Sequence, residues 1–160
     1  MSLLGIIHTL IGVVAVIAGI IALAREFRIT SKNSVGQVYI HSTVLTCLTG
    51  FGIYNQGGFG VPHVLGIITL LVLGAAWLAE VKQTFGTKSK LVETLCYTTT
   101  LFFHFIPGIT ETSTRLPVGA PLIASRESPV LAGIIGTVFV IFLVIMVKQV
   151  KGLKAAQRSM

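Results

Sequence analysis

The sequence contains no aspartate, and glutamate supplies all five of its acidic residues. Charged residues make up 11% of the 160 residues, whereas apolar residues make up 53%. In a soluble domain about a quarter of the residues are charged. The scarcity of charge therefore excludes an ordinary soluble domain, and the mean hydropathy of +0.90 favours a membrane protein.

Cysteine is scarce as well, because the chain has only Cys47 and Cys96, each inside an apolar run. Isolated thiols in such surroundings behave as small apolar residues, so we expect neither a disulfide nor a cysteine metal site. The sequence also lacks a nucleophile with a matching base and a phosphate-binding glycine loop. It therefore assigns no catalytic residue, and whether the protein is an enzyme stays open.

Long apolar runs are what the chain has in abundance. A hydrocarbon core of about 30 Å takes roughly 20 helical residues, and in lipid the backbone groups must be satisfied within the segment. The runs that meet this length cover residues 3–24, 35–54, 63–81, 91–107 and 130–147. We therefore predict an all-α integral membrane bundle of five transmembrane helices in a single domain, residues 1–160. The fourth helix is expected to end at Pro107-Gly108, followed by a loop over 109–129.

The net charge of +7 is placed unevenly along the chain. Ten of the twelve basic residues follow the first, third and fifth runs: Arg25, Arg28, Lys32, Lys82, Lys88, Lys90, Lys148, Lys151, Lys154 and Arg158. By the positive-inside rule the N-terminus lies outside and the C-terminus in the cytoplasm. These charges are orientation signals, so we expect a lipid bilayer as partner, a bacterial cytoplasmic (inner) membrane as location, and no nucleic acid.

All four histidines lie in or at the edge of the runs. His8, His63 and His104 are near the predicted outer side, and His41 is near the inner side. Ionisable groups within spanning segments are functional candidates. The alternative for each is a structural hydrogen bond, for example between His41 and Gln37 one turn earlier.

Two periodic patterns place some of these histidines in the bundle interior. Glu93, Tyr97, Thr100 and His104 are spaced 4, 3 and 4, which puts them on one helical stripe. We expect this stripe to face the other helices, because lipid contact would be costly. Four polar-cored helices with the fifth at the periphery are predicted.

The first run carries glycines every seven residues, at Gly5, Gly12 and Gly19, beside His8. Such a face allows the close approach of another helix or of a flat cofactor.

Imidazole chemistry leaves several ligands open. Haem b needs two histidines at similar depth on facing helices, and His8 with His104 fits best, with His63 as an alternate. Glu111 and Arg115 then serve as capping or propionate-binding groups, although they also suit a plain surface pair. Three imidazoles with Glu111 would instead bind a transition metal, and a histidine with a carboxylate would exchange protons with a quinone.

The chain resembles a family of uncharacterised bacterial multi-span membrane proteins over roughly residues 35–110. The resemblance rests on three segments: Gly36 with Tyr39; Phe59, Gly60, His63 and Leu65; and Phe105, Pro107 and Gly108. It implies a multi-span topology and no particular activity. The histidine that this family usually has before its fourth helix is absent here. A second, weaker similarity is to small b-type cytochromes, on the histidines in a helical bundle alone.

Three functional hypotheses follow. The leading one is a redox-associated inner-membrane protein that binds haem b or a quinone near the outer face through its histidines. The second is a non-catalytic accessory or assembly subunit that docks on a larger membrane complex or forms a homo-oligomer. The third is a small transporter or proton conductor that uses the stripe from Glu93 to His104.

Overall fold

All the regular elements are helices in the part of the chain that the computed structural model describes, residues 2–54 and 58–158. Its α-helices are α1 (Leu3–Glu26), α2 (Ser34–Phe51), α3 (Val61–Trp77), α4 (Ser89–Arg115) and α5 (Pro129–Arg158). A π-helical turn, η1 (Leu78–Lys82), and a 3-10 turn, η2 (Gly86–Lys88), connect α3 to α4. No strand occurs within these ranges, so the predicted all-α class is confirmed.

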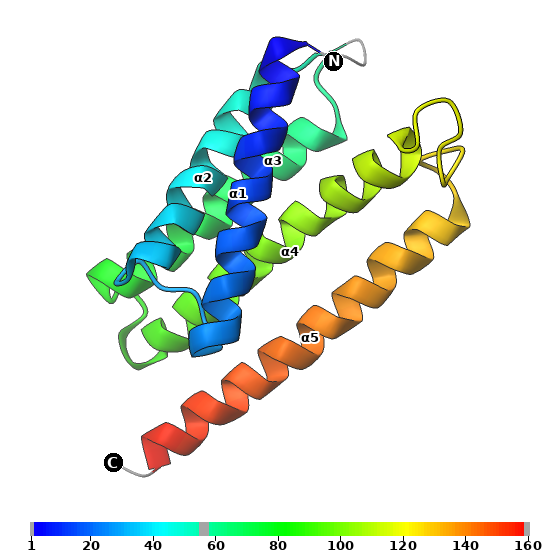
Figure 1. Ribbon diagram of the computed structural model, residues 1–160. Coiled ribbons are helices and arrows are strands. Elements are labelled where there is room, and N and C mark those ends of the chain that lie inside the picture. Colours follow the sequence, from blue (N-terminus) through cyan, green and yellow to red (C-terminus); the bar gives the residue numbers. More distant parts are fainter. Residues whose placement is uncertain (1, 55–57, 159–160) are drawn as a thin grey trace.

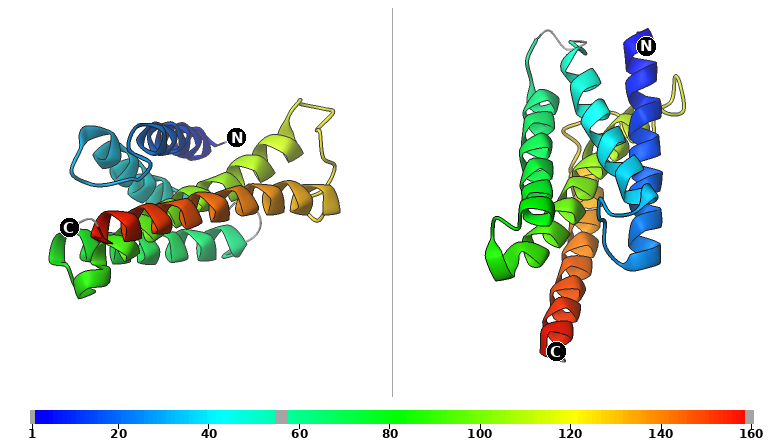
Figure 2. Two further views of the ribbon diagram at one scale, coloured as in Figure 1. Left: turned by 90° about the horizontal axis from the view of Figure 1, so that it is seen from below. Right: turned by 90° about the vertical axis from the view of Figure 1, so that its left-hand side faces the viewer.

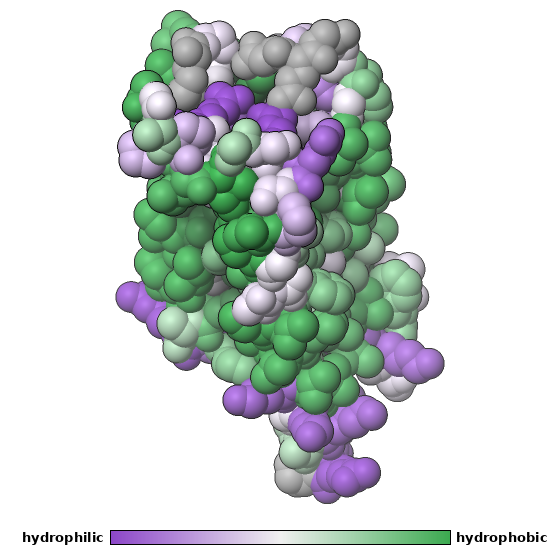
Figure 3. Space-filling view, turned by 90° about the vertical axis from the view of Figure 1, so that its right-hand side faces the viewer, coloured by the Kyte–Doolittle hydropathy of each residue, from purple (hydrophilic) through white to green (hydrophobic). Residues whose placement is uncertain are grey.

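Among the described residues, three helical segments are long and apolar enough to cross a membrane: Leu3–Glu26, Val61–Lys82 and Pro129–Arg158. Only 11–28% of each apolar window is buried, so most of these side chains face outward. A surface this apolar on a helical bundle suits lipid rather than water. Figure 3 shows it as a broad hydrophobic band with hydrophilic residues gathered towards the two ends. The predicted membrane character of the chain is therefore confirmed.

The helices run side by side along the length of the molecule (Figure 1), with α1 packed mainly on α2, and α4 on α3 and α5. The N-terminus, the α2–α3 connection and the α4–α5 connection share one end, which we call the N-terminal end. The other end has the α1–α2 and α3–α4 connections and the C-terminus (Figures 1 and 2). We call it the basic end, because the ten basic residues named above lie there.

The fourth helix does not end at Pro107-Gly108, as the sequence had suggested, but continues to Arg115. A proline inside a helix removes only one backbone hydrogen bond, here the one that the carbonyl oxygen of Phe103 would accept, and a long helix tolerates that loss. The predicted loop over 109–129 is therefore reduced to 116–128, and Glu111 lies on a helix.

The fifth helix is also longer than the predicted run of 130–147, since α5 extends to Arg158. The added segment is rich in lysine, alanine and glutamine, which are good helix formers, and contains no proline. Most of α5 is exposed, which agrees with its predicted peripheral place. It contacts α4 through Phe142, whose ring centroid is 5.6 Å from that of Phe102.

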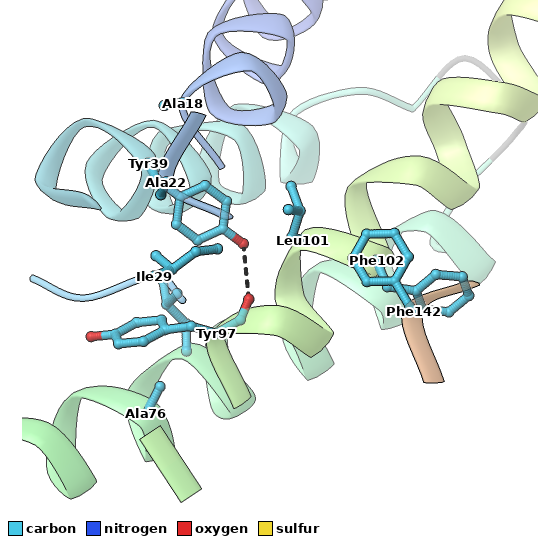
Figure 4. Packing of buried hydrophobic residues seen from close by; sticks show 10 residues of the cluster. Ala18, Ala22, Ile29, Tyr39, Ala76, Tyr97, Leu101, Phe102 and Phe142 are labelled. Atoms are coloured by element: carbon cyan, nitrogen blue, oxygen red, sulfur yellow. Dashed lines mark hydrogen bonds between the residues drawn. The ribbon is translucent and has the colours of Figure 1, made fainter. Parts of the chain in front are cut away.

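The apolar core lies where the helices cross, and Figure 4 shows it at close range. Its buried members are Ala18, Ala22, Ile29, Tyr39, Leu73, Ala76, Tyr97, Leu101, Phe102 and Phe142. Gly19 lets α1 approach this core, because a Cβ there would be 2.6 Å from Cδ1 of Leu101 and 3.0 Å from Cδ2 of Tyr39. At Gly19 the glycine face is therefore filled by neighbouring side chains, as plain helix packing requires.

Candidate functional site

His8 lies on α1 near the N-terminal end, against α2. Its Nδ1 is 3.1 Å from Oγ1 of Thr49, and that hydroxyl lies 2.7 Å from the carbonyl oxygen of Leu45. The Thr49 hydroxyl has one proton, and we assign it to the bond with the carbonyl oxygen of Leu45, because a carbonyl can only accept. The same hydroxyl oxygen must then accept from His8, so Nδ1 of His8 carries a proton. Nε2 then carries a lone pair and has no side-chain partner among the described residues, while the ring also makes a hydrogen bond to the backbone of Thr46.

His104 lies on α4 and also contacts α2. Its Nε2 is 3.0 Å from Oγ1 of Thr43, and its ring meets that of Tyr39 edge-on at a centroid distance of 6.2 Å. The side chain is only 9% exposed. Over residues 2–54 and 58–158, Nδ1 of His104 has no hydrogen-bond partner. Like His8, it is oriented by a threonine hydroxyl at one ring nitrogen and has no side-chain partner at the other.

His8 and His104, which we call the histidine pair, are close enough to interact electrostatically. Glu111 lies two turns further along α4, towards the N-terminal end, and it also interacts electrostatically with His8. The structure thus places two of the three histidines that the sequence singled out within electrostatic range of each other, and the Glu111 carboxylate within range of His8.

Glu111 belongs to an ion cluster on the surface of the N-terminal end. Nε of Arg115 lies 2.5 Å from one of its carboxylate oxygens, and Nη2 of Arg126 lies 2.5 Å from the other. All three side chains are partly exposed, with exposed fractions of 35–43%. Exposed pairs contribute little to stability, so the cluster can rearrange around another anion. The sequence did not indicate Arg126 as a member of this cluster, because nothing in it shows that the α4–α5 connection folds back onto α4.

His63 is not part of this arrangement. It sits in the first turn of α3, where its Nδ1 accepts a hydrogen bond from the backbone N–H of Gly60 at 3.1 Å. Its ring stacks between those of Tyr54 and Phe59, at centroid distances of 5.2 and 5.0 Å. Because Nδ1 accepts, Nε2 of the neutral ring carries the proton, which makes His63 a helix-capping residue and a poor metal ligand.

A metal centre built from three histidines is not present in the described part of the chain, because no three His, Cys or Glu side chains there come close enough to hold an ion. His41 is exposed on α2, where its Nδ1 bonds to the backbone oxygen of Gln37 at 2.8 Å. This is the structural pairing that the sequence indicated as the alternative to a functional role.

The polar stripe of α4 faces the interior, as predicted. Glu93, Tyr97, Thr100 and His104 are all at most 9% exposed. They do not form one hydrogen-bonded chain, however. The hydroxyl of Tyr39 meets Thr100 at 2.7 Å and the backbone oxygen of Tyr97 at 3.5 Å, whereas the hydroxyl of Tyr97 points the other way (Figure 4). Glu93 is held by Lys90 at 2.7 Å.

The group that sequence reasoning missed is Glu80, in η1 near the basic end. This carboxylate is only 3% exposed. It accepts hydrogen bonds from the backbone N–H of Ser31 at 2.9 and 3.0 Å, from the Tyr97 hydroxyl at 2.9 Å, and from the Thr30 hydroxyl. We call Thr30, Ser31, Glu80 and Tyr97 the Glu80 cluster. A lone carboxylate at the end of an apolar run was the available signal, since a buried charge requires donors.

No family model, no curated protein and no solved structure matches this chain. The resemblance to an uncharacterised membrane family and to b-type cytochromes therefore stays a prediction. The function has to be argued from the geometry of the chain itself.

Proposed function

We propose that all five helices span the membrane, with the N-terminus outside and the C-terminus in the cytoplasm. Three helices have the required length and hydropathy. The other two, α2 and α4, run alongside them (Figure 1) and turn most of the polar residues of their central turns inward, so their outer faces can meet lipid. Ten basic residues at one end favour the cytoplasm for that end.

We further propose that the protein is redox-associated and binds haem b through the histidine pair. The observation that carries this proposal is that His8 and His104 each have one ring nitrogen held by a threonine hydroxyl and, among the described residues, no side-chain partner at the other. Histidines that ligate metals are typically oriented in this way, through a hydrogen bond at the second nitrogen.

The number of ligands favours haem over a bare ion. A structural zinc ion needs four protein ligands, and the described residues offer no group of three. A porphyrin supplies four nitrogens of its own and requires only axial ligands, for which two imidazoles suffice. Bound haem would supply one-electron transfer at this end of the bundle.

The ion cluster beside the pair suits the other parts of such a ligand. Arg115 and Arg126 share the single carboxylate of Glu111, so the cluster has a net positive charge. Haem carries two propionates, and guanidinium groups bind carboxylates through paired hydrogen bonds. This keeps Glu111 and Arg115 in the roles predicted from the sequence and adds Arg126.

The proposal is tested by the absorbance spectrum of the protein purified from cells supplied with haem. We expect a Soret band in the wild type that is lost in His8→Ala and in His104→Ala. His41→Ala is the matched control, because it removes an imidazole from a helix of the same bundle where the ring is exposed and bonded to its own backbone. His63→Ala should keep the band as well.

A wild-type protein without a Soret band, or a band that survives in both His8→Ala and His104→Ala, contradicts haem binding by the pair. Solvent extraction of the same preparations then tests the quinone, which should be bound to the wild type and absent from His104→Ala. If both ligands are absent and the histidine variants co-purify with a stable partner, the accessory-subunit hypothesis replaces the redox one.

A further inference from the structure

The basic end has far more positive charge than its own carboxylates can balance. Three glutamates lie there, and each is engaged: Glu26 with Asn33 at 2.7 Å, Glu80 in its cluster, and Glu93 with Lys90. Nine basic residues at this end therefore form no ion pair within the described ranges: Arg25, Arg28, Lys32, Lys82, Lys88, Lys148, Lys151, Lys154 and Arg158.

Four of these nine lie on one face of α5, which we call the basic face: Lys148, Lys151, Lys154 and Arg158. Their spacing of 3, 3 and 4 keeps them within an arc of about 120° on a helix with 100° per residue. Gln149, on the opposite face, is buried and donates to the backbone oxygen of Phe27 at 2.9 Å. Gln149 thus fixes the rotation of α5, and the basic face points away from the bundle, where its side chains are exposed.

The basic face also starts at the right depth for a membrane surface. The apolar part of α5, residues 130–147, is about 27 Å long at 1.5 Å per residue, close to the thickness of the hydrocarbon core. Lys148 and Lys151 therefore come just past the edge of the hydrocarbon, at the level of the phosphates. The end of α5 that carries them projects beyond the bundle (Figures 1 and 3).

We propose that the basic end binds the phosphate groups of anionic phospholipids, with the basic face of α5 as the principal contact. The described carboxylates at this end do not supply the complementary charge, and the membrane presents it at the depth where these lysines lie. Each lysine near an anionic surface strengthens binding about fivefold, and salt screens the attraction. The proposal rests on membrane insertion, as proposed above, and not on haem.

The test compares two variants that each lose two positive charges. Lys148→Gln/Lys151→Gln loses them at the basic end, and Arg115→Gln/Arg126→Gln loses them at the N-terminal end. Each protein is purified in mixed micelles with equal amounts of phosphatidylglycerol and phosphatidylcholine, and the retained lipids are counted by mass spectrometry. We expect the wild type to retain mainly phosphatidylglycerol. The lysine variant should lose affinity for it on the order of 25-fold at low salt, while the arginine variant keeps it.

Equal retention of phosphatidylglycerol by the lysine variant and the wild type would overturn the proposal, as would an equal loss in the arginine variant. Inorganic phosphate and duplex DNA are added in parallel at low salt. Displacement of the lipid by phosphate at equal concentration, or retention of DNA that depends on the two lysines, also overturns it. If the lysine variant does not fold, Lys151→Gln/Lys154→Gln is measured instead, because it leaves the residues on both sides of Gln149, Lys148 and Val150, unchanged.

Discussion

The histidine pair and the Glu80 cluster are both polar groups inside an apolar bundle, one towards each end, yet they differ in how completely they are satisfied. Donors from the α1–α2 connection and from α4 hold both oxygens of Glu80. Within the described chain, His104 has only the Thr43 hydroxyl as partner, and His8 has the Thr49 hydroxyl and the backbone of Thr46, so neither ring has a side-chain partner at its second nitrogen. A saturated group can only hold the fold together, whereas a half-satisfied one still has bonds to offer a ligand.

The two sites should therefore respond differently to substitution. Changes in the Glu80 cluster are expected to lower the free energy of unfolding and to leave the spectrum of any folded protein intact. Changes in the histidine pair should leave the free energy of unfolding nearly unchanged and remove the haem spectrum. Four predictions test this contrast, measured as reversible unfolding in mixed micelles.

Glu80→Ala should have the largest effect. It strips the acceptor from the hydroxyls of Thr30 and Tyr97 and from the backbone N–H of Ser31, all in a buried site. Unsatisfied buried donors cost about 1–3 kcal/mol each, so we expect a loss of about 4 kcal/mol. Glu93→Ala is the matched control, because its carboxylate is bonded only to the half-exposed Lys90. An equal loss of unfolding free energy in Glu93→Ala would contradict the inference that the donors around Glu80 make its cluster unusually stabilising.

Gly36→Ala should have the second-largest effect and lower the free energy of unfolding by about 3 kcal/mol. A Cβ at Gly36 would lie 1.8 Å from the backbone oxygen of Thr30, and a backbone atom cannot swing aside as a side chain does. The substitution forces apart α2 and the segment that donates to Glu80. Gly74→Ala is the control, because no atom lies within 4 Å of a Cβ at that position on α3. It should be neutral or slightly stabilising.

Much of this architecture follows from periodicity and charge, which depend on one segment at a time. The stripe from Glu93 to His104 could be placed inside the bundle because its spacing matches the helical repeat and lipid contact is costly. The basic residues similarly identify one end of the molecule. Such local patterns survive folding because they concern which face of a single helix is buried.

Features that depend on two segments were beyond reach. The sequence could not show that Nδ1 of His63 is bonded to Gly60 and that its ring stacks on Tyr54 and Phe59, since its depth alone matched that of the other histidines. It also could not show that Ser31 and Tyr97 converge on Glu80. The continuation of α4 past Pro107 was misjudged because a proline was taken as a stop, although one missing hydrogen bond is tolerable in a long helix.

Tyr97→Phe should cost less than the glycine substitution, about 2 kcal/mol, because it removes one hydrogen bond to a buried carboxylate. Tyr39→Phe is its matched control. That hydroxyl meets the neutral Thr100, and a bond between neutral groups is worth about 1 kcal/mol. If Tyr39→Phe proves the more costly of the two, the charge of Glu80 is not what makes the cluster strong, and the contrast with the histidine pair loses its electrostatic basis.

His104→Gln should have the smallest effect on stability, below about 1 kcal/mol, because the amide of glutamine can still bond to the hydroxyl of Thr43. The same substitution should abolish haem binding, since an amide nitrogen has no lone pair to offer iron. The two results separate ligand chemistry from packing at one position. A loss of stability as large as that of Tyr97→Phe would mean that His104 is needed by the fold itself, and the open nitrogen would then be a by-product of packing with no ligand to bind.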